Sequence, residues 1–132
     1  ERAIEMERAL RLAEAVGNLQ VDLQVAMLAG ISFSVPPGMR QELKATLVSL
    51  EGQRETQVEA VRGTMVHYLA FTYERFTIEE LGTMLAHMRR PAARRFVDGT
   101  MRGLGEAMAS TSLAFGDRLG QALAHAGAGE SI

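Results

Sequence analysis

Apolar residues recur at every third or fourth position along most of this chain, with polar residues between them. That spacing gathers apolar side chains on one side of an α-helix, whereas a half-buried strand would show strict alternation. No alternating run bounded by turn residues occurs in the sequence. Six segments follow the helical spacing: 3–16, 19–31, 39–50, 58–76, 78–88 and 91–123. We therefore predict an all-α protein.

Three places interrupt the helical spacing. Gly17-Asn18 is predicted to end the first helix, because glycine just after a periodic run commonly terminates helices. The run 34–38 contains two adjacent prolines and gives the clearest break. Residues 51–57 have no apolar side chain, so they form either a turn near Gly52 or a solvated stretch of a longer helix. The pattern leaves open whether residues 39–75 make one helix or two.

The strongest local signal is a capping box at Thr77. The Thr77 side chain is expected to accept from the Glu80 amide, and the Glu80 side chain to accept from the Thr77 amide. Phe76 and Leu81 occupy the positions of a hydrophobic staple. Pro91 is predicted to begin the last helix, since proline suits the first helical position.

The length of 132 residues is that of one ordinary domain. We predict a single-domain bundle of five to six helices over residues 1–126, with a long C-terminal helix and a flexible tail at 127–132. Glycine pairs in the last helix have the spacing of close helix contacts: Gly99 with Gly103, and Gly116 with Gly120. Charged residues interrupt this segment, so we expect these contacts between helices of a soluble bundle, not of a membrane span.

The composition removes several classes of function. A net charge of −2 lacks the basic excess of nucleic-acid-binding proteins, so no nucleic-acid partner is expected. The absence of cysteine excludes disulfides, cysteine-based zinc sites and thiol nucleophiles. The three histidines, His67, His87 and His125, are far apart and match no metal-binding motif. We expect no metal and no cofactor.

No catalytic constellation is visible. Neither a nucleophile elbow nor a phosphate-binding loop occurs. Glu79 and Glu80 diverge by about 100° on a helix, and helix capping explains them better than acid–base catalysis. Met84 and Met88, with His87 beside them, could bind Cu(I), but methionine more often fills a core. The sequence therefore predicts a protein that is not an enzyme.

One polar cluster is a candidate binding site. It consists of Arg89, Arg90, Arg94 and Arg95, with Arg102 further along. These residues surround a predicted helix start, where exposed amides and the helix dipole attract anions. An anionic lipid head group or an acidic partner would fit there. The competing interpretation is a solvated surface paired with neighbouring acids.

Two motifs resemble a known family. Residues 73–81, Tyr-Glu-Arg-Phe-Thr-Ile-Glu-Glu-Leu, are similar to its Y-x-x-x-F-T-x-E-E-L signature, and residues 88–96 to its F-Y-x-S-P-x-G-x-K element. Arg90 stands where that element has serine, and Ala93 where it has glycine. Residues 10–17 are similar to its opening L-L-x-x-x-G helix. The family is domain of unknown function 2059. The resemblance implies a helical fold and a periplasmic or secreted location in bacteria, but no activity.

Three functions agree with these patterns. The first is a non-enzymatic domain of the bacterial envelope that binds another protein or forms a homodimer. The second is a carrier of a lipid or other apolar ligand in a cavity between helices. The third is a DNA-binding helix-turn-helix within residues 77–96, which the acidic total charge and Pro91 disfavour.

Overall fold

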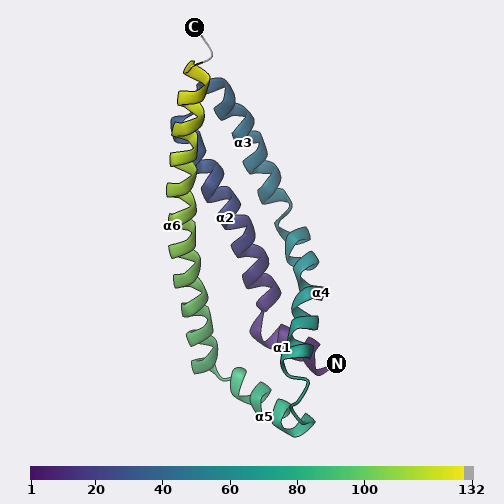
Figure 1. Ribbon diagram of the computed structural model, residues 1–132. Coiled ribbons are helices and arrows are strands. Elements are labelled where there is room, and N and C mark those ends of the chain that lie inside the picture. Colours follow the sequence, from purple (N-terminus) through teal and green to yellow (C-terminus); the bar gives the residue numbers. More distant parts are fainter. Residues whose placement is uncertain (130–132) are drawn as a thin grey trace. The chain divides into compact units, whose positions relative to one another are not determined.

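All regular secondary structure over residues 1–129, the part that the computed structural model describes, is α-helical. Six α-helices and no strand are present in this range (Figure 1). They are α1 (Arg2–Leu10), α2 (Leu12–Ser34), α3 (Pro37–Gly52), α4 (Arg54–Thr72), α5 (Ile78–Met88) and α6 (Pro91–Gly129). The prediction of an all-α fold with five to six helices and a long C-terminal helix is confirmed. No helix within these residues has the length and apolar character needed to cross a bilayer.

Contacts between residues divide the chain into two compact units. Unit 1 consists of Glu1–Asn18 and Glu55–Gly103, and unit 2 of Leu19–Arg54 together with the chain from Leu104 onward. The single domain proposed for residues 1–126 stays a prediction. Helix α6 includes positions 127–129 of the expected tail, and the rest of that tail, 130–132, lies outside the described residues.

The predicted helix end at Gly17-Asn18 is wrong, because the break lies at Arg11. Arg11 has left-handed backbone angles (φ 52°, ψ 37°), and its N–H donates to the Glu7 carbonyl to close α1. Helix α2 then continues through Gly17, which is buried. A Cβ atom at Gly17 would lie 2.7 Å from the Cα of Val58. This glycine therefore allows α2 to approach α4 closely and does not end a helix.

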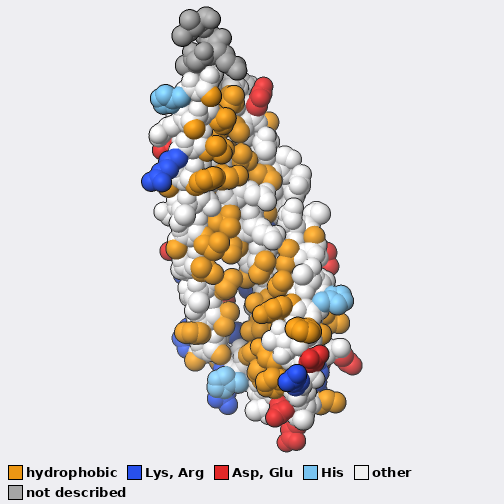
Figure 2. Space-filling view, in the orientation of Figure 1, with side chains coloured by type: hydrophobic (Ala, Val, Ile, Leu, Met, Phe, Trp, Pro, Cys, Tyr) orange, Lys and Arg blue, Asp and Glu red, His pale blue; other side chains and the backbone are white. Residues whose placement is uncertain are grey.

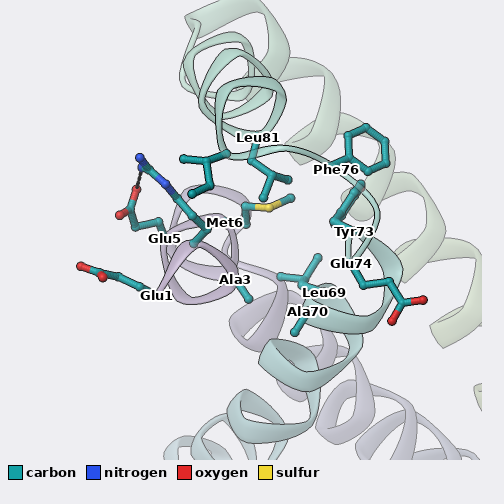
Figure 3. A pocket seen from close by; sticks show the side chains of 12 residues that line it. Glu1, Ala3, Glu5, Met6, Leu69, Ala70, Tyr73, Glu74, Phe76 and Leu81 are labelled. Atoms are coloured by element: carbon teal, nitrogen blue, oxygen red, sulfur yellow. Dashed lines mark hydrogen bonds and ion pairs between the residues drawn. The ribbon is translucent and has the colours of Figure 1, made fainter.

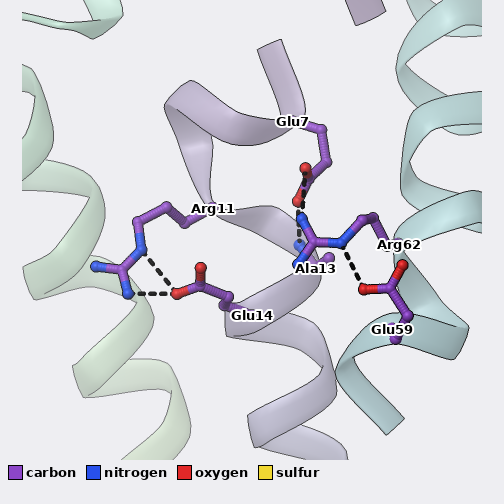
Figure 4. Close-up of polar contacts among 6 residues, drawn as sticks. All are labelled: Glu7, Arg11, Ala13, Glu14, Glu59 and Arg62. Carbon is purple, nitrogen blue, oxygen red and sulfur yellow. Dashed lines mark hydrogen bonds and ion pairs between the residues drawn. The ribbon is translucent and has the colours of Figure 1, made fainter. Parts of the chain in front are cut away.

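Glu7 stabilises the break between α1 and α2, and its partners also belong to unit 1 (Figure 4). Its side chain is 2% exposed, and its Oε1 accepts a hydrogen bond from the Ala13 amide at 3.2 Å. Amides in the first turn of a helix have no intrahelical partner, so Glu7 caps α2 from the preceding helix. The other carboxylate oxygen, Oε2, lies 3.0 Å from Nη1 of Arg62 on α4. The hydrogen bond to Glu59, and next the charge of Glu7, raise the pKa of Arg62 above its usual high value.

The core of unit 1 is small and apolar. Met6 of α1, Leu69 of α4 and Leu85 of α5 form its buried cluster. The partly buried residues packed against this cluster are Ala3, Ala9, Leu10, Leu12, Tyr73, Leu81 and Met84. The three buried residues come from three helices, so this cluster holds α1, α4 and α5 together.

Unit 2 is built on a close contact between α2 and α6. A Cβ atom at Gly116 would lie 2.0 Å from the Met27 carbonyl oxygen, and one at Gly30 would lie 2.1 Å from the Leu113 carbonyl oxygen. Gly120 approaches the backbone of Ile31 in the same way, at 2.6 Å. The residue numbers of the contacting pairs increase together along the two helices. Helices α2 and α6 therefore run in the same direction (Figure 1). The close contact predicted from the spacing of Gly116 and Gly120 is confirmed.

The pair Gly99 and Gly103 behaves differently. Beyond the adjoining backbone of α6, no atom of the described residues lies within 4 Å of a Cβ atom built at either position. The predicted close contact is therefore wrong for this pair. The spacing of two glycines does not show which face of a helix packs against a neighbour. Glycine has no side chain whose polarity would indicate whether the position is buried.

The remaining breaks agree with the sequence. Helix α2 ends at Ser34, before the two prolines, and α6 begins at Pro91. Residues 39–75 form two helices, because α3 ends at Gly52 and α4 begins at Arg54. The capping box is present: the Thr77 hydroxyl accepts from the Glu80 amide, and the Glu80 carboxylate accepts from the Thr77 amide.

Thr77→Ala is expected to lower the free energy of unfolding by about 1 kcal/mol, because it leaves a first-turn amide of α5 without its acceptor. Urea denaturation followed by circular dichroism measures this loss. Thr83→Ala on the same helix is the matched control. The Thr83 hydroxyl donates to a carbonyl that the helix already satisfies, so the control should change stability by less than about 0.5 kcal/mol. Equal losses in the two variants would contradict the capping role.

Candidate functional site

An open hollow in unit 1 is the candidate site, and we call it the apolar hollow (Figure 3). Its volume is about 630 Å³. Its lining residues come from α1, the C-terminal part of α4, the turn after α4 and the start of α5: Glu1, Arg2, Ala3, Glu5, Met6, Leu69, Ala70, Tyr73, Glu74, Phe76, Ile78 and Leu81. This volume lies within the range of about 300–1,000 Å³ seen for binding pockets. Side chains from separate helices therefore converge on one concave surface.

The floor of the apolar hollow is the core of unit 1. Met6 and Leu69 are buried, and Leu81 packs against them. Tyr73 and Phe76 stand beside this floor with their rings edge to face, 5.4 Å between centroids and 77° between planes. An edge-to-face pair is a favourable aromatic arrangement, so each ring supports the other at the wall of the hollow.

The short segment between α4 and α5 positions the aromatic wall. The Phe76 amide donates to the Tyr73 carbonyl at 3.1 Å, which tightens the turn. The capping box at Thr77 then starts α5 immediately after Phe76. Phe76 and Ile78 consequently lie on the two sides of the helix start, and both face the apolar hollow.

The rim of the apolar hollow is predominantly acidic. Glu1, Glu5 and Glu74 contribute three carboxylates, against one guanidinium from Arg2. Arg2 is paired with Glu5, its Nη1 3.0 Å from Oε2, and Arg89 also approaches that carboxylate at 4.0 Å. The Glu1 and Glu74 carboxylates extend away from the floor at separate places on the rim (Figure 3). The rim therefore favours a cationic group over an anionic one.

The structure does not gather the four predicted arginines into one pocket. Arg89 ends α5 and approaches Glu5, as described above. Arg90 and Arg95 are exposed and line none of the described hollows. Arg94 alone lines a second, smaller hollow. The anion-binding role of these residues stays a prediction.

The second hollow contains basic residues that the sequence analysis missed. Its volume is about 170 Å³, and it joins Arg94 and Asp98 of α6 with Arg8 and Arg11 of the first segment. Arg11 is also tied to Glu14, with Nε 2.7 Å from its Oε2. No local pattern indicates this set, because residues of α1 and α6 meet only in the folded unit.

The methionine and histidine candidates lie on one surface. Met84, His87 and Met88 line a third hollow formed by α5 and the cap preceding it. Met84 also packs against the core of unit 1, as expected for a core methionine. His67 and His125 are exposed, and each ring Nδ1 contacts a carbonyl of its own helix. Among the described residues, no group of three or more acidic or histidine side chains could hold a metal ion.

Comparison with known proteins adds no relative. No protein-family model matches the chain, and no curated protein or solved structure is detectably similar to it. The membership in domain of unknown function 2059 therefore stays a prediction from residues 73–81 and 88–96.

Proposed function

We propose that this chain is a non-enzymatic interaction module whose apolar hollow receives an apolar helical segment of a partner protein. One observation carries the proposal: a concave apolar surface in unit 1 has a buried floor, an aromatic wall and an acidic rim. Helices that bind in grooves use an apolar face with anchors spaced by three or four residues. The resemblance of residues 73–81 and 88–96 supports a bacterial envelope location as part of this proposal.

Exposed apolar residues beside the apolar hollow support the same function. Ile78 and Phe76 line it and are 72% and 45% exposed. Single apolar residues at a surface are common, but exposed apolar residues that line one concave surface mark a place where another molecule binds. Aromatic residues are enriched among the side chains that dominate binding energy.

The charge of the rim specifies the partner further. Glu1 and Glu74 are exposed and have no ion-pair partner among the described residues. A bound segment with lysine or arginine at the edges of its apolar face would pair with these carboxylates. The partner segment is therefore an amphipathic helix with an apolar face bordered by basic residues.

A designed amphipathic peptide of leucine and lysine, about 18 residues or five helical turns long, provides the test. We expect it to bind the full chain with a Kd in the micromolar range, measured by fluorescence anisotropy of the labelled peptide. The corresponding leucine–glutamate peptide should bind at least about tenfold more weakly, because its carboxylates face the acidic rim.

Two variants with the same change in charge separate the apolar hollow from the rest of the surface. Ile78→Lys places a cation at its wall and should weaken binding of the leucine–lysine peptide about tenfold. Phe71→Lys changes a residue that is 75% exposed and does not line the apolar hollow, and it should leave Kd within about twofold. Equal binding of both peptides, or equal effects of both variants, would remove the support for this site.

The volume of the apolar hollow also favours a second candidate, a carrier of a lipid or other apolar ligand. A fluorescent fatty acid distinguishes the two functions. A carrier would bind the free fatty acid in a saturable way and release the leucine–lysine peptide in its presence. An interaction module would bind the peptide without being affected by the fatty acid.

A further inference from the structure

A row of exposed apolar side chains follows α6 through unit 2, and we call it the α6 stripe. Its members are Leu104, Met108, Phe115, Leu119 and Leu123. Each is between 37% and 58% exposed. Figure 2 shows hydrophobic side chains gathered along the α6 part of the face in view. This row is separate from the apolar hollow, because all its members belong to unit 2.

The α6 stripe keeps to one side of a straight helix. Leu104 and Phe115 are separated by the same interval as Met108 and Leu119, an interval of about three helical turns. From its first to its last member the row covers about 28 Å of helix, at about 1.5 Å per residue. A side chain row of this length and regularity is suited to pack against another helix.

The glycine contact with α2 leaves this side of α6 uncovered. Phe115 and Leu119 immediately precede Gly116 and Gly120, the residues that meet the backbone of α2. Consecutive helical residues point about 100° apart, so the α6 stripe lies roughly a quarter turn from α2. The contact that builds unit 2 therefore does not use the apolar stripe.

The order of residues along the α6 stripe fits a second copy of the chain, because the apolar positions are arranged symmetrically about one point. Leu104 and Leu123 are equally distant from the point between Leu113 and Ala114, and so are Met108 and Leu119. Two antiparallel copies related by a twofold axis at that point would place apolar residues opposite apolar residues. Phe115 would face the small residue Ser112 of the second copy, so a large side chain would meet a small one.

We propose that two copies of this chain associate through antiparallel packing of their α6 stripes. Five half-exposed side chains offer on the order of 400 Å² of apolar surface, about half of what one partner contributes to a standard interface. We therefore expect a reversible dimer with a Kd in the micromolar range. The proposal is independent of the apolar hollow, and peptide binding in unit 1 would neither support nor contradict it.

Sedimentation equilibrium of the full chain, from about 5 to about 200 µM, tests the association. The unaltered chain should change from monomer to dimer across this range. Met108→Lys and Leu119→Glu, each made alone, should raise the dimer Kd at least about tenfold, because each buries an unpaired charge. Phe96→Lys is the control on the same helix, since Phe96 is 74% exposed and outside the α6 stripe, and it should leave Kd unchanged.

The double variant Met108→Lys with Leu119→Glu tests the antiparallel register. In the proposed dimer each introduced lysine faces the glutamate of the other copy, so dimerisation should return to within about threefold of the unaltered chain. In a parallel pair each introduced lysine would face another lysine, and dimerisation would stay weak. A monomer at every concentration, unchanged dimerisation in the single variants, or a double variant that stays monomeric would each overturn the proposal.

Discussion

Gly116→Ala is expected to destabilise unit 2 by about 3 kcal/mol or more, which would lower Tm by roughly 10 °C. The added methyl carbon would lie 2.0 Å from the carbonyl oxygen of Met27, much closer than van der Waals contact permits. The neighbouring atoms are backbone, so no side chain can rotate to make room. Helices α2 and α6 would have to separate, which would also disturb the contacts at Gly30 and Gly120.

Gly103→Ala is the control for this prediction, because it makes the same change in the same helix. Within the described part of the chain, no atom apart from the adjoining backbone of α6 lies within 4 Å of a Cβ atom built at Gly103. Alanine there should stabilise the chain by about 0.5–1 kcal/mol, since it reduces the freedom of the unfolded chain and favours the helix. Thermal and urea denaturation measure both variants. A Gly116→Ala chain as stable as the unaltered one would show that α2 and α6 do not meet at these glycines.

The second large effect is expected at Glu7. Glu7→Ala should lower the free energy of unfolding by about 3 kcal/mol, because it removes the cap of α2 and leaves a gap in a buried position. The Ala13 amide would lose its acceptor, and Arg62 would lose one of its two carboxylate partners. Unit 1 contains few buried apolar residues, so this loss is a large part of its stability.

Two further variants separate the causes of that loss. Glu7→Gln keeps an oxygen for the Ala13 amide but removes the charge, and we expect it to cost less than Glu7→Ala. Glu59→Ala removes the other partner of Arg62, but the Glu59 side chain is 74% exposed. It should therefore cost less than about 1 kcal/mol. If Glu7→Ala and Glu59→Ala had equal effects on urea denaturation, Glu7 would act only as a surface ion-pair partner.

The helices could be predicted well from the sequence, because their signals are local. The capping box at Thr77, Pro91 at the start of α6 and the two prolines at the start of α3 act on the nearest residues alone. The end of α1 was missed for a physical reason. Arg11 adopts a left-handed conformation that arginine rarely takes, and the cap from Glu7 helps to hold it in the folded unit. Gly17 carried a local signal for a helix end, but its role depends on Val58.

Less of the candidate site than of the helices could be predicted from the sequence. Phe76 and Leu81 were predicted to form a hydrophobic staple, and both line the apolar hollow. Met6 and Leu69 join them only after α1 packs against α4, a contact with no local pattern. The arginine cluster illustrates the opposite error. Residues close in sequence point in different directions around a helix, so Arg94 and Arg95 do not share one pocket.

Each unit combines an early and a late stretch of the chain, and this affects how the protein is made. A ribosome synthesises α2 long before α6. The contact at Gly30 can therefore form only after Gly116 has left the ribosome. No cut at a single position releases either unit intact, because each cut separates pieces that belong together. Truncation from either end would therefore leave at least one unit incomplete. Point substitutions are the appropriate way to assign a role to each unit.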